Sequence, residues 1–357
     1  MKPKLLRVVF IVPRYGTVLR GVETFVSELI SHLDINSFKI TIISGCHSEV
    51  IDDIDFYQYP LPLRENQSWM SFIPLFCRNI LNIYSLGTPS DIESMNLYLS
   101  AKCRFTKESF DIAVPLGGLW TYYLARLISV KVVGVGQSGP ERKCLRLSDV
   151  FVALTPFDEK RAKVIYPTIA TTLIPNGVNV DRFRPTRSPL GGSEVILCVA
   201  ALVEDKRHDL LFDAVLGLPT AVSVVCIGDG PLRQKLLRHP LALAGRVDFR
   251  VTPFNKIHFE YEAAAVFSLP SLDEAFGIVF VEAMAAGLPI VANDGPRQRF
   301  VIGENGLLCD VTNTEIYRLK LSEALKIGRS LAVRNYAVSR FSWEKISAAY
   351  SNLFISL

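Results

Sequence analysis

The stretch VFSLPSLDEAFGIVFVEAMAAGLPIVA, residues 266–292, contains the pattern from which the fold is predicted. Val266–Leu269 is an apolar run of strand length, and Pro289–Ala292 is a second one. Between them we expect a helix through Val279 to Ala286. Strands that alternate with helices form parallel sheets with right-handed crossovers. The stretch therefore predicts one strand–helix–strand unit of a parallel sheet.

The same alternation runs through the rest of the chain. Val8–Val12 is β-branched, apolar and closed by Pro13, which is typical of a strand buried on both faces. Thr155 followed by Pro156 predicts the capped start of a helix. Further strands are expected at residues 39–43, 112–114, 131–135, 150–154, 195–199 and 222–227, and a further helix at Lys206–Val215. Two such series predict two doubly wound α/β domains.

A segment rich in Pro, Gly and Arg, residues 184–192, separates the two series. We expect an N-terminal Rossmann-like domain at residues 1–170 and a linker at 171–190. A second domain follows at 191–340, and a last helix at 341–357. In doubly wound sheets ligands bind outside the carboxyl ends of the strands, so we expect the site in a cleft between the domains.

Composition excludes several classes of protein. The 357 residues include 39 Lys and Arg against 35 Asp and Glu, a net charge of +4 that is too small to indicate nucleic-acid binding. No apolar run is long enough for a membrane span, and the first residues lack the pattern of a signal peptide. Seven cysteines without a C-x-x-C pair are typical of a reducing compartment. We therefore expect a cytoplasmic protein.

An apolar stripe between Trp69 and Tyr84 recurs at helical spacing. A core-facing helix is the simpler interpretation of this stripe. The alternative is an apolar wall for a lipid-linked acceptor, or a contact with the inner face of the membrane.

The loop after Val266–Leu269 carries the residues with the clearest chemistry. Glu274 lies in that loop, and Gly277 lets the backbone pass close to a ligand. The helix that follows begins near Ile278 and offers its free N–H groups to an anion. Glu282, about one turn further on, is placed to accept hydrogen bonds from a ribose. This arrangement favours a nucleotide sugar, and a capped helix with two solvated glutamates is the alternative.

Glu274 and Glu282 are eight positions apart, and their segment resembles the two-glutamate signature of family-4 retaining glycosyltransferases. In the first half the resemblance rests on Gly21-Val22-Glu23-Thr24 and on the strand order. It implies the GT-B fold, in which two Rossmann-like domains face each other across a cleft. Further segments of the second half that resemble the family are residues 174–185, 202–211, 228–231, 304–308 and 341–344.

The resemblance also implies roles for single residues. Lys206 would neutralise the donor diphosphate, and Glu274 would bind the transferred sugar, so these two are the expected catalytic residues. Glu282 would bind the ribose, and Gly21 would approach the diphosphate from the first domain. The remaining expected donor contacts are Arg207, Phe276, Gly277, Ile278 and Val279.

The sequence departs from the family pattern at three places. The family often has Gly-Gly in the first loop, and here the pair is Arg20-Gly21. The family usually has an arginine five residues before the lysine, and here that position is Ala201. Many members carry a histidine in the first domain near the donor sugar, whereas residues 133–139 contain none. Gln137 or Ser138 would have to take the place of that histidine. The last two departures motivate a non-catalytic sugar-nucleotide-binding subunit as an alternative function.

The expected function is that of a retaining, metal-independent glycosyltransferase without a cofactor. It would move a sugar, of the hexose type, from a nucleotide-diphosphate sugar to a hydroxyl acceptor, which is a glycan, a lipid-linked molecule or a small molecule. The five histidines show no spacing of metal ligands. A nucleotide-sugar epimerase of the same fold is a further alternative. The glycines of Gly134-x-Gly136-x-x-Gly139 also match a dinucleotide fingerprint. The donor, acceptor, linkage and oligomeric state are not determined by the sequence.

Overall fold

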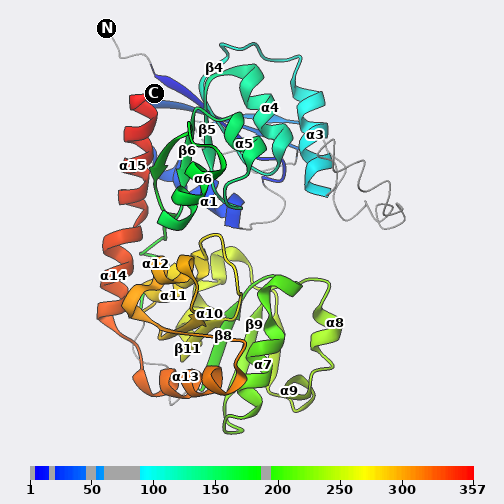
Figure 1. Ribbon diagram of the computed structural model, residues 1–357, viewed down its shortest axis with the longest axis vertical. Coiled ribbons are helices and arrows are strands. Elements are labelled where there is room, and N and C mark those ends of the chain that lie inside the picture. Colours follow the sequence, from blue (N-terminus) through cyan, green and yellow to red (C-terminus); the bar gives the residue numbers. More distant parts are fainter. Residues whose placement is uncertain (1–4, 16–20, 46–53, 60–88, 186–193) are drawn as a thin grey trace. The chain divides into compact units, whose positions relative to one another are not determined.

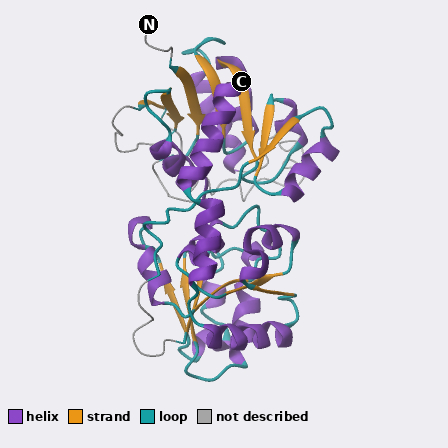
Figure 2. Ribbon diagram, turned by 90° about the vertical axis from the view of Figure 1, so that its left-hand side faces the viewer, coloured by secondary structure: helices purple, strands orange, loops and turns teal. Residues whose placement is uncertain are grey.

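The computed structural model describes residues 5–15, 21–45, 54–59, 89–185 and 194–357. Its internal contacts divide the chain into two units. Unit 1 comprises Met1–Pro175 and Ile346–Leu357, and unit 2 comprises Asn176–Lys345. In each unit, helices surround a sheet in which every strand pairing is parallel (Figures 1 and 2). The predicted pair of parallel-sheet α/β domains is confirmed.

Unit 1 has, in its described part, a seven-stranded sheet in the order β3-β2-β1-β4-β5-β6-β7. Its strands are β1 (Leu6–Ile11), β2 (Phe38–Ser44), β3 (Asp55–Gln58), β4 (Phe110–Pro115), β5 (Ser129–Val135), β6 (Val150–Ala153) and β7 (Ala170–Leu173). Its helices are α1 (Gly21–His32), α3 (Pro89–Ala101), α4 (Leu119–Ile128), α5 (Arg142–Arg146) and α6 (Pro156–Ile165). β7 extends this sheet to Leu173, inside the segment expected as a linker.

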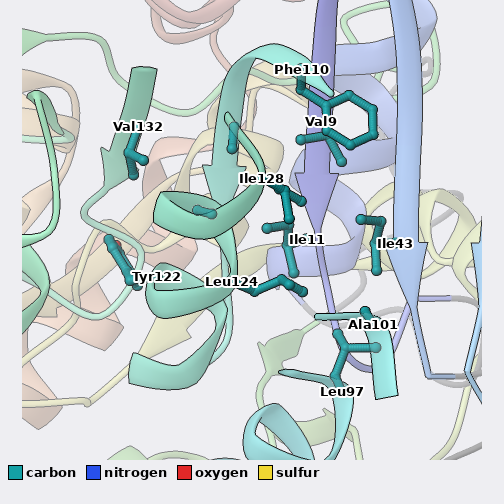
Figure 3. Packing of buried hydrophobic residues seen from close by; sticks show 12 residues of the cluster. Val9, Ile11, Ile43, Leu97, Ala101, Phe110, Tyr122, Leu124, Ile128 and Val132 are labelled. Carbon is teal, nitrogen blue, oxygen red and sulfur yellow. The ribbon is translucent and has the colours of Figure 1, made fainter. Parts of the chain in front are cut away.

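The core of unit 1 forms where the central strands meet helices α3 and α4. Strand β1 is central because it pairs with both β2 and β4. Its residues Val9 and Ile11 pack with Leu97 of α3 and Leu124 of α4, and all four are fully buried (Figure 3). The apolar run at Val8–Val12 thus has the burial that its composition predicts.

Helix α15 (Trp343–Ser356) begins in unit 2 and ends in unit 1. Tyr350 packs edge-on against Phe25 of α1 with ring centroids 5.8 Å apart, and Phe354 packs against Phe38 of β2. The end of the chain is therefore part of the core of unit 1.

Unit 2 has a six-stranded sheet in the order β10-β9-β8-β11-β12-β13 among its described residues. Its strands are β8 (Val195–Val199), β9 (Ser223–Ile227), β10 (Val247–Arg250), β11 (Val266–Leu269), β12 (Ile290–Asn293) and β13 (Leu307–Cys309). Its helices are α7 (His208–Leu216), α8 (Arg233–Leu236), α9 (Pro240–Leu243), α10 (His258–Ala263), α11 (Ile278–Ala285), α12 (Pro296–Ile302), α13 (Thr314–Ile327) and α14 (Leu331–Phe341).

Two details differ from the sequence expectations. The helix expected from Lys206 begins only at His208, because Arg207 takes a left-handed backbone conformation (φ 50°) after a short 3-10 turn at Glu204–Lys206. The first glycine of the dinucleotide pattern, Gly134, lies inside β5, where a Cβ would stand 2.5 Å from the Ser148 hydroxyl. Close packing against Ser148 therefore explains why this position is a glycine. The stripe between Trp69 and Tyr84 lies outside the described residues.

Candidate functional site

The strand order of unit 2 reverses between β8 and β11. From β8 the chain proceeds to β9 and β10 on one side, and β11 begins the other side with β12 and β13. The loops that leave the carboxyl ends of β8 and β11 diverge at such a reversal, and open α/β sheets bind ligands there. The loop after β8 carries Lys206, and the loop after β11 carries Glu274. The topology thus brings these predicted residues together.

Lys206 and Glu274 form an ion pair in which the Lys206 ammonium donates to Glu274 Oε1. The two side chains are 68 positions apart in sequence, and they are 25 % and 11 % exposed. Each charge of the pair is therefore balanced by the other. A polyanion that reaches Lys206 must compete with Glu274.

Arg207 differs from its neighbour Lys206 in orientation. Its guanidinium makes hydrogen bonds of 3.3 Å to both carboxylate oxygens of Asp209. The left-handed backbone at Arg207 separates the 3-10 turn from α7. Arg207 is therefore anchored toward α7, while Lys206 pairs with the loop after β11.

Gly277 shapes the start of helix α11. It is the N-cap residue, with φ 78° and ψ 65°, and no side chain caps the helix there. A Cβ at this position would collide with the Phe280 ring, so only glycine fits without a shift. Ile278 and Val279 are half-buried at the first turn, and Phe276 is buried against the Phe341 ring. The helix N-terminus next to Glu274 is thus suited to an anion.

Glu282 lies on the buried side of α11. Its side chain comes from the same helix whose N-terminus adjoins Glu274, and the residue is only 6 % exposed. The hydroxyl of Tyr261, from α10, donates to Glu282 Oε2 at 2.6 Å. Burial, and then the charge of Glu282, raise the pKa of Tyr261 well above its ordinary value, so the phenol stays a donor. Tyr261 therefore holds this carboxylate in one orientation.

The loop between β11 and α11 is held by residues that the sequence did not single out. The Ser271 hydroxyl donates to the backbone oxygens of Asp205 and Asp273, which ties this loop to the one carrying Lys206. The buried guanidinium of Arg297, from α12, pairs with Asp273. No local pattern identifies Ser271 or Arg297, because their partners belong to other elements.

The Gly228-Asp229-Gly230 turn after β9 packs against the backbone after β8. A Cβ at Gly228 would collide with the Ala200 carbonyl, and one at Gly230 would stand 2.5 Å from that of Leu202. Leu202 N–H donates to Asp229 O at 3.0 Å. Ala201 is exposed between these contacts. The glycines therefore fix the path of the loop that ends in Lys206.

Unit 1 contains its own pocket, with a volume of about 570 Å³. It lies at the carboxyl ends of β4 and β5 and beside the start of α1, and the strand order of this sheet reverses between β1 and β4. Gly21 is the first residue of α1, and its neighbour Val22 lines the pocket. Gln137 and Ser138, at the stretch without the expected histidine, line it as well.

No helix among the described residues has the length and apolarity to cross a membrane. No group of three or more His, Cys, Asp or Glu side chains is arranged there to hold a metal ion. Metal independence of the reaction stays a prediction.

Comparison with known proteins gives a family for the second half of the chain. Residues 180–338 match the profile of the family described as glycosyl transferases group 1. A curated relative is the GDP-mannose-dependent alpha-(1-6)-phosphatidylinositol monomannoside mannosyltransferase of Mycolicibacterium smegmatis, which is 28 % identical over 236 residues. The match covers 58 % of this chain and 62 % of that protein, less than two thirds of its length.

Solved structures resemble the chain over almost its whole length. Sucrose-phosphate synthase from Thermosynechococcus elongatus gives a TM-score of 0.77 at 16 % identity, with 98 % of both chains covered. HepE of Anabaena, in complex with UDP and glucose, gives 0.71 at 15 % identity and covers 99 % of this chain and 100 % of its own. At these identities the likeness shows the fold alone. The chain has the GT-B fold, and its residues 180–338 are similar to the glycosyl transferases group 1 family.

Proposed function

We propose that the chain is a retaining glycosyltransferase that transfers a sugar from a nucleotide-diphosphate sugar to a hydroxyl group. The observation that carries the proposal is the Lys206–Glu274 pair at the point where the sheet of unit 2 reverses its strand order. A cation for phosphate and a carboxylate for sugar hydroxyls stand there beside the uncapped N-terminus of α11.

In the proposed complex the donor diphosphate takes the place of Glu274 on the Lys206 ammonium. The first N–H groups of α11, from Ile278 and Val279, add hydrogen bonds to the same phosphates. Glu274, released from the pair, accepts hydrogen bonds from the sugar. Glu282, oriented by Tyr261, accepts those of the ribose. The names of relatives support a nucleotide donor, since one includes GDP-mannose and HepE was solved with UDP and glucose.

The proposed transfer step makes use of this charge arrangement. The acceptor oxygen forms a bond to the anomeric carbon on the side from which the diphosphate leaves, and the acceptor proton passes to a phosphate oxygen. Negative charge grows on the diphosphate as the glycosidic bond breaks, so Lys206 stabilises the transition state more than the ground state. Retention of the anomeric configuration and independence of metal ions are both part of this proposal.

The first experiment measures binding of UDP and GDP by isothermal titration calorimetry. A panel of nucleotide sugars then follows, with hydrolysis or transfer detected by NMR in the presence and absence of EDTA. We expect binding of at least one nucleoside diphosphate, turnover that EDTA does not abolish, and a product with the anomeric configuration of the donor.

Other outcomes separate the alternatives. Binding without turnover of any donor, even with a panel of acceptors, identifies a sugar-nucleotide-binding subunit, which Ala201 and the histidine-free stretch at residues 133–139 motivated. A change of configuration within the free nucleotide sugar identifies an epimerase. Lack of binding of both UDP and GDP contradicts the proposed function.

A further inference from the structure

Two cysteines of unit 2 lie opposite each other on neighbouring strands, β8 and β9 (Figure 1). Cys198 of β8 and Cys226 of β9 are paired in the parallel ladder, so their side chains leave the same face of the sheet. Neighbouring strands are about 4.8 Å apart, and the two Cα atoms of a disulfide are usually about 4.4–6.8 Å apart. Both cysteines are fully buried. The backbone therefore holds the two thiols at a separation that a disulfide can bridge.

His208, the first residue of α7, completes the cluster. It is only 1 % exposed, and neither of its ring nitrogens has a hydrogen-bond partner within the described residues. A buried polar group without a partner is unusual and requires an explanation. The charge of His208 acts on the Cys198 thiol, so the ring lies close to that sulfur. An imidazole close to a thiol is the arrangement in which the ring can take up the thiol proton.

The two thiols differ in acidity. The pKa of Cys198 is lowered, first by the hydrogen bond that it accepts from the Cys226 thiol and then, against the effect of burial, by the charge of His208. The pKa of Cys226 is raised well above its ordinary value by the same hydrogen bond and by burial. Cys198 is therefore the nucleophilic sulfur of the pair, and Cys226 keeps its proton.

Two other described cysteines lack such an environment. Burial raises the pKa of Cys144 to about 12 and that of Cys309 to about 11. Thiols of this kind stay protonated at neutral pH and react slowly with oxidants. They are internal controls for the reactivity of the Cys198–Cys226 pair.

The cluster lies just below the strand ends from which the candidate site is built. Cys198 and Cys226 are each the last residue but one of their strand, and the loop after β8 leads to Lys206 and His208. Arg207, between these two, is the one residue other than glycine with a positive φ in the described part of the chain. Such a backbone is strained, so local opening at residues 204–208 gives a small oxidant a short path to the buried sulfurs.

We propose that Cys198 and Cys226 form a reversible disulfide when they meet a hydroperoxide, of which hydrogen peroxide is the simplest, and that His208 takes up the Cys198 proton. This inference does not depend on the proposed function. In a reducing compartment such a disulfide is transient, so it acts as a response to oxidants rather than as a permanent cross-link.

The reaction balances with the peroxide as the oxidant. The Cys198 thiolate attacks one peroxide oxygen, so that an S–O bond forms and the O–O bond breaks, and the hydroxide that leaves takes the proton from His208 and becomes water. The Cys226 sulfur then attacks the sulfenic sulfur. An S–S bond forms, the S–O bond breaks, and the second hydroxide leaves with the Cys226 proton as water. Two thiols together lose two electrons, and one hydrogen peroxide is reduced to two waters.

The test treats the reduced full chain with hydrogen peroxide at neutral pH and blocks the remaining thiols with iodoacetamide. Tryptic peptides are then mapped by mass spectrometry without reduction. Trypsin cleaves after Lys206 and Arg207, between the two cysteines, so the disulfide joins two separate peptides. We expect this cross-linked pair as the main disulfide, with a mass two hydrogen atoms below the sum of the two peptides. Dithiothreitol should reverse it.

Variants assign the role of each side chain. Cys198→Ala should leave Cys226 unoxidised, because burial still keeps that thiol protonated. Cys226→Ala should stop the reaction at the sulfenic acid of Cys198, which dimedone traps. His208→Gln should slow the cross-link about fivefold or more, because Cys198 loses its proton acceptor. Cys309→Ala, at a buried cysteine outside the cluster, is the matched control and should leave the rate unchanged.

A structural role of His208 gives a different result. If the substitution only loosened the fold, all buried thiols would become accessible, and the oxidation of Cys144 and Cys309 would speed up together with that of the pair. The proposal is overturned if Cys198 and Cys226 stay unlinked while the exposed Cys103 is oxidised, which shows that the oxidant was active. Oxidation of Cys226 at an unchanged rate in Cys198→Ala also contradicts it, and an unchanged rate in His208→Gln excludes the role of the imidazole.

Discussion

Glu274→Gln and Lys206→Ala should change the affinity for a bare nucleoside diphosphate in opposite directions. The Lys206 ammonium is held by Glu274, so a diphosphate must displace that carboxylate. Glu274→Gln removes the competing charge and leaves Lys206 available. Lys206→Ala removes the cation itself. If the ion pair had only a structural role, the two substitutions would not be expected to change this affinity in opposite directions.

The magnitudes follow from burial and charge. Two unit charges in contact attract by about 5.5 kcal/mol at an effective dielectric constant of about 20. Most of this attraction is offset by the desolvation of the two charged groups. The Lys206 side chain is also 25 % exposed, so solvent weakens the pair further. Opening the pair then costs about 1 kcal/mol, so Glu274→Gln should tighten binding about fivefold. A charged hydrogen bond to phosphate contributes about 1.5–3 kcal/mol, so Lys206→Ala should weaken binding about 10- to 150-fold.

Isothermal titration calorimetry with UDP and GDP at two ionic strengths measures both effects. The double variant Lys206→Ala/Glu274→Gln should bind like Lys206→Ala, because Glu274 acts on the nucleotide through Lys206. With a complete sugar donor, Glu274→Gln should lower turnover despite the tighter nucleotide, since the sugar has lost its acceptor of hydrogen bonds. If both single variants weaken nucleotide binding to a similar extent, the ion pair has only a structural role and the reasoning is refuted.

Three further predictions concern stability. Tyr261→Phe removes a buried hydrogen bond to a carboxylate and should cost about 1–3 kcal/mol in urea denaturation. Tyr350→Phe, at a buried hydroxyl without a partner in the described chain, should cost almost nothing; equal losses would contradict this account. Gly277→Ala should lower the midpoint of thermal unfolding more than Gly245→Ala does. Both glycines have a positive φ, but only at Gly277 would the added Cβ collide with a side chain, the Phe280 ring. The reverse order of the two midpoints would be inconsistent with the structure. Stability should fall as pH rises above about 10, because the folded protein keeps phenolic protons that the unfolded chain releases; a flat midpoint from pH 9 to 11 would refute this. Burial raises the pKa of four tyrosines well above 10.0 in the folded state, namely Tyr122, Tyr261, Tyr317 and Tyr350.

Much of the fold was predictable because its signals are local. Strands buried on both faces read as continuous apolar runs, and β1, β8 and β11 follow the runs that predicted them. Thr155 accepts from Asp158 N–H at the start of α6 with Pro156 in the first turn, as the dipeptide predicts. The missed strands β3, β7, β10 and β13 are the edge strands of the two sheets, and Cys309 is the one buried residue among them.

The sequence alone determined which elements form and which residues stand at the ends of strands. Glu274, Gly277 and Glu282 could be proposed as site residues because a strand, a loop and a helix follow one another within a single segment. Only the tertiary structure decided their partners. The pairing of Lys206 with Glu274, of Tyr261 with Glu282 and of Ser271 with the loop after β8 joins elements that are distant in sequence. Strand order brings such groups together, and strand order depends on packing across the whole sheet rather than on any local pattern.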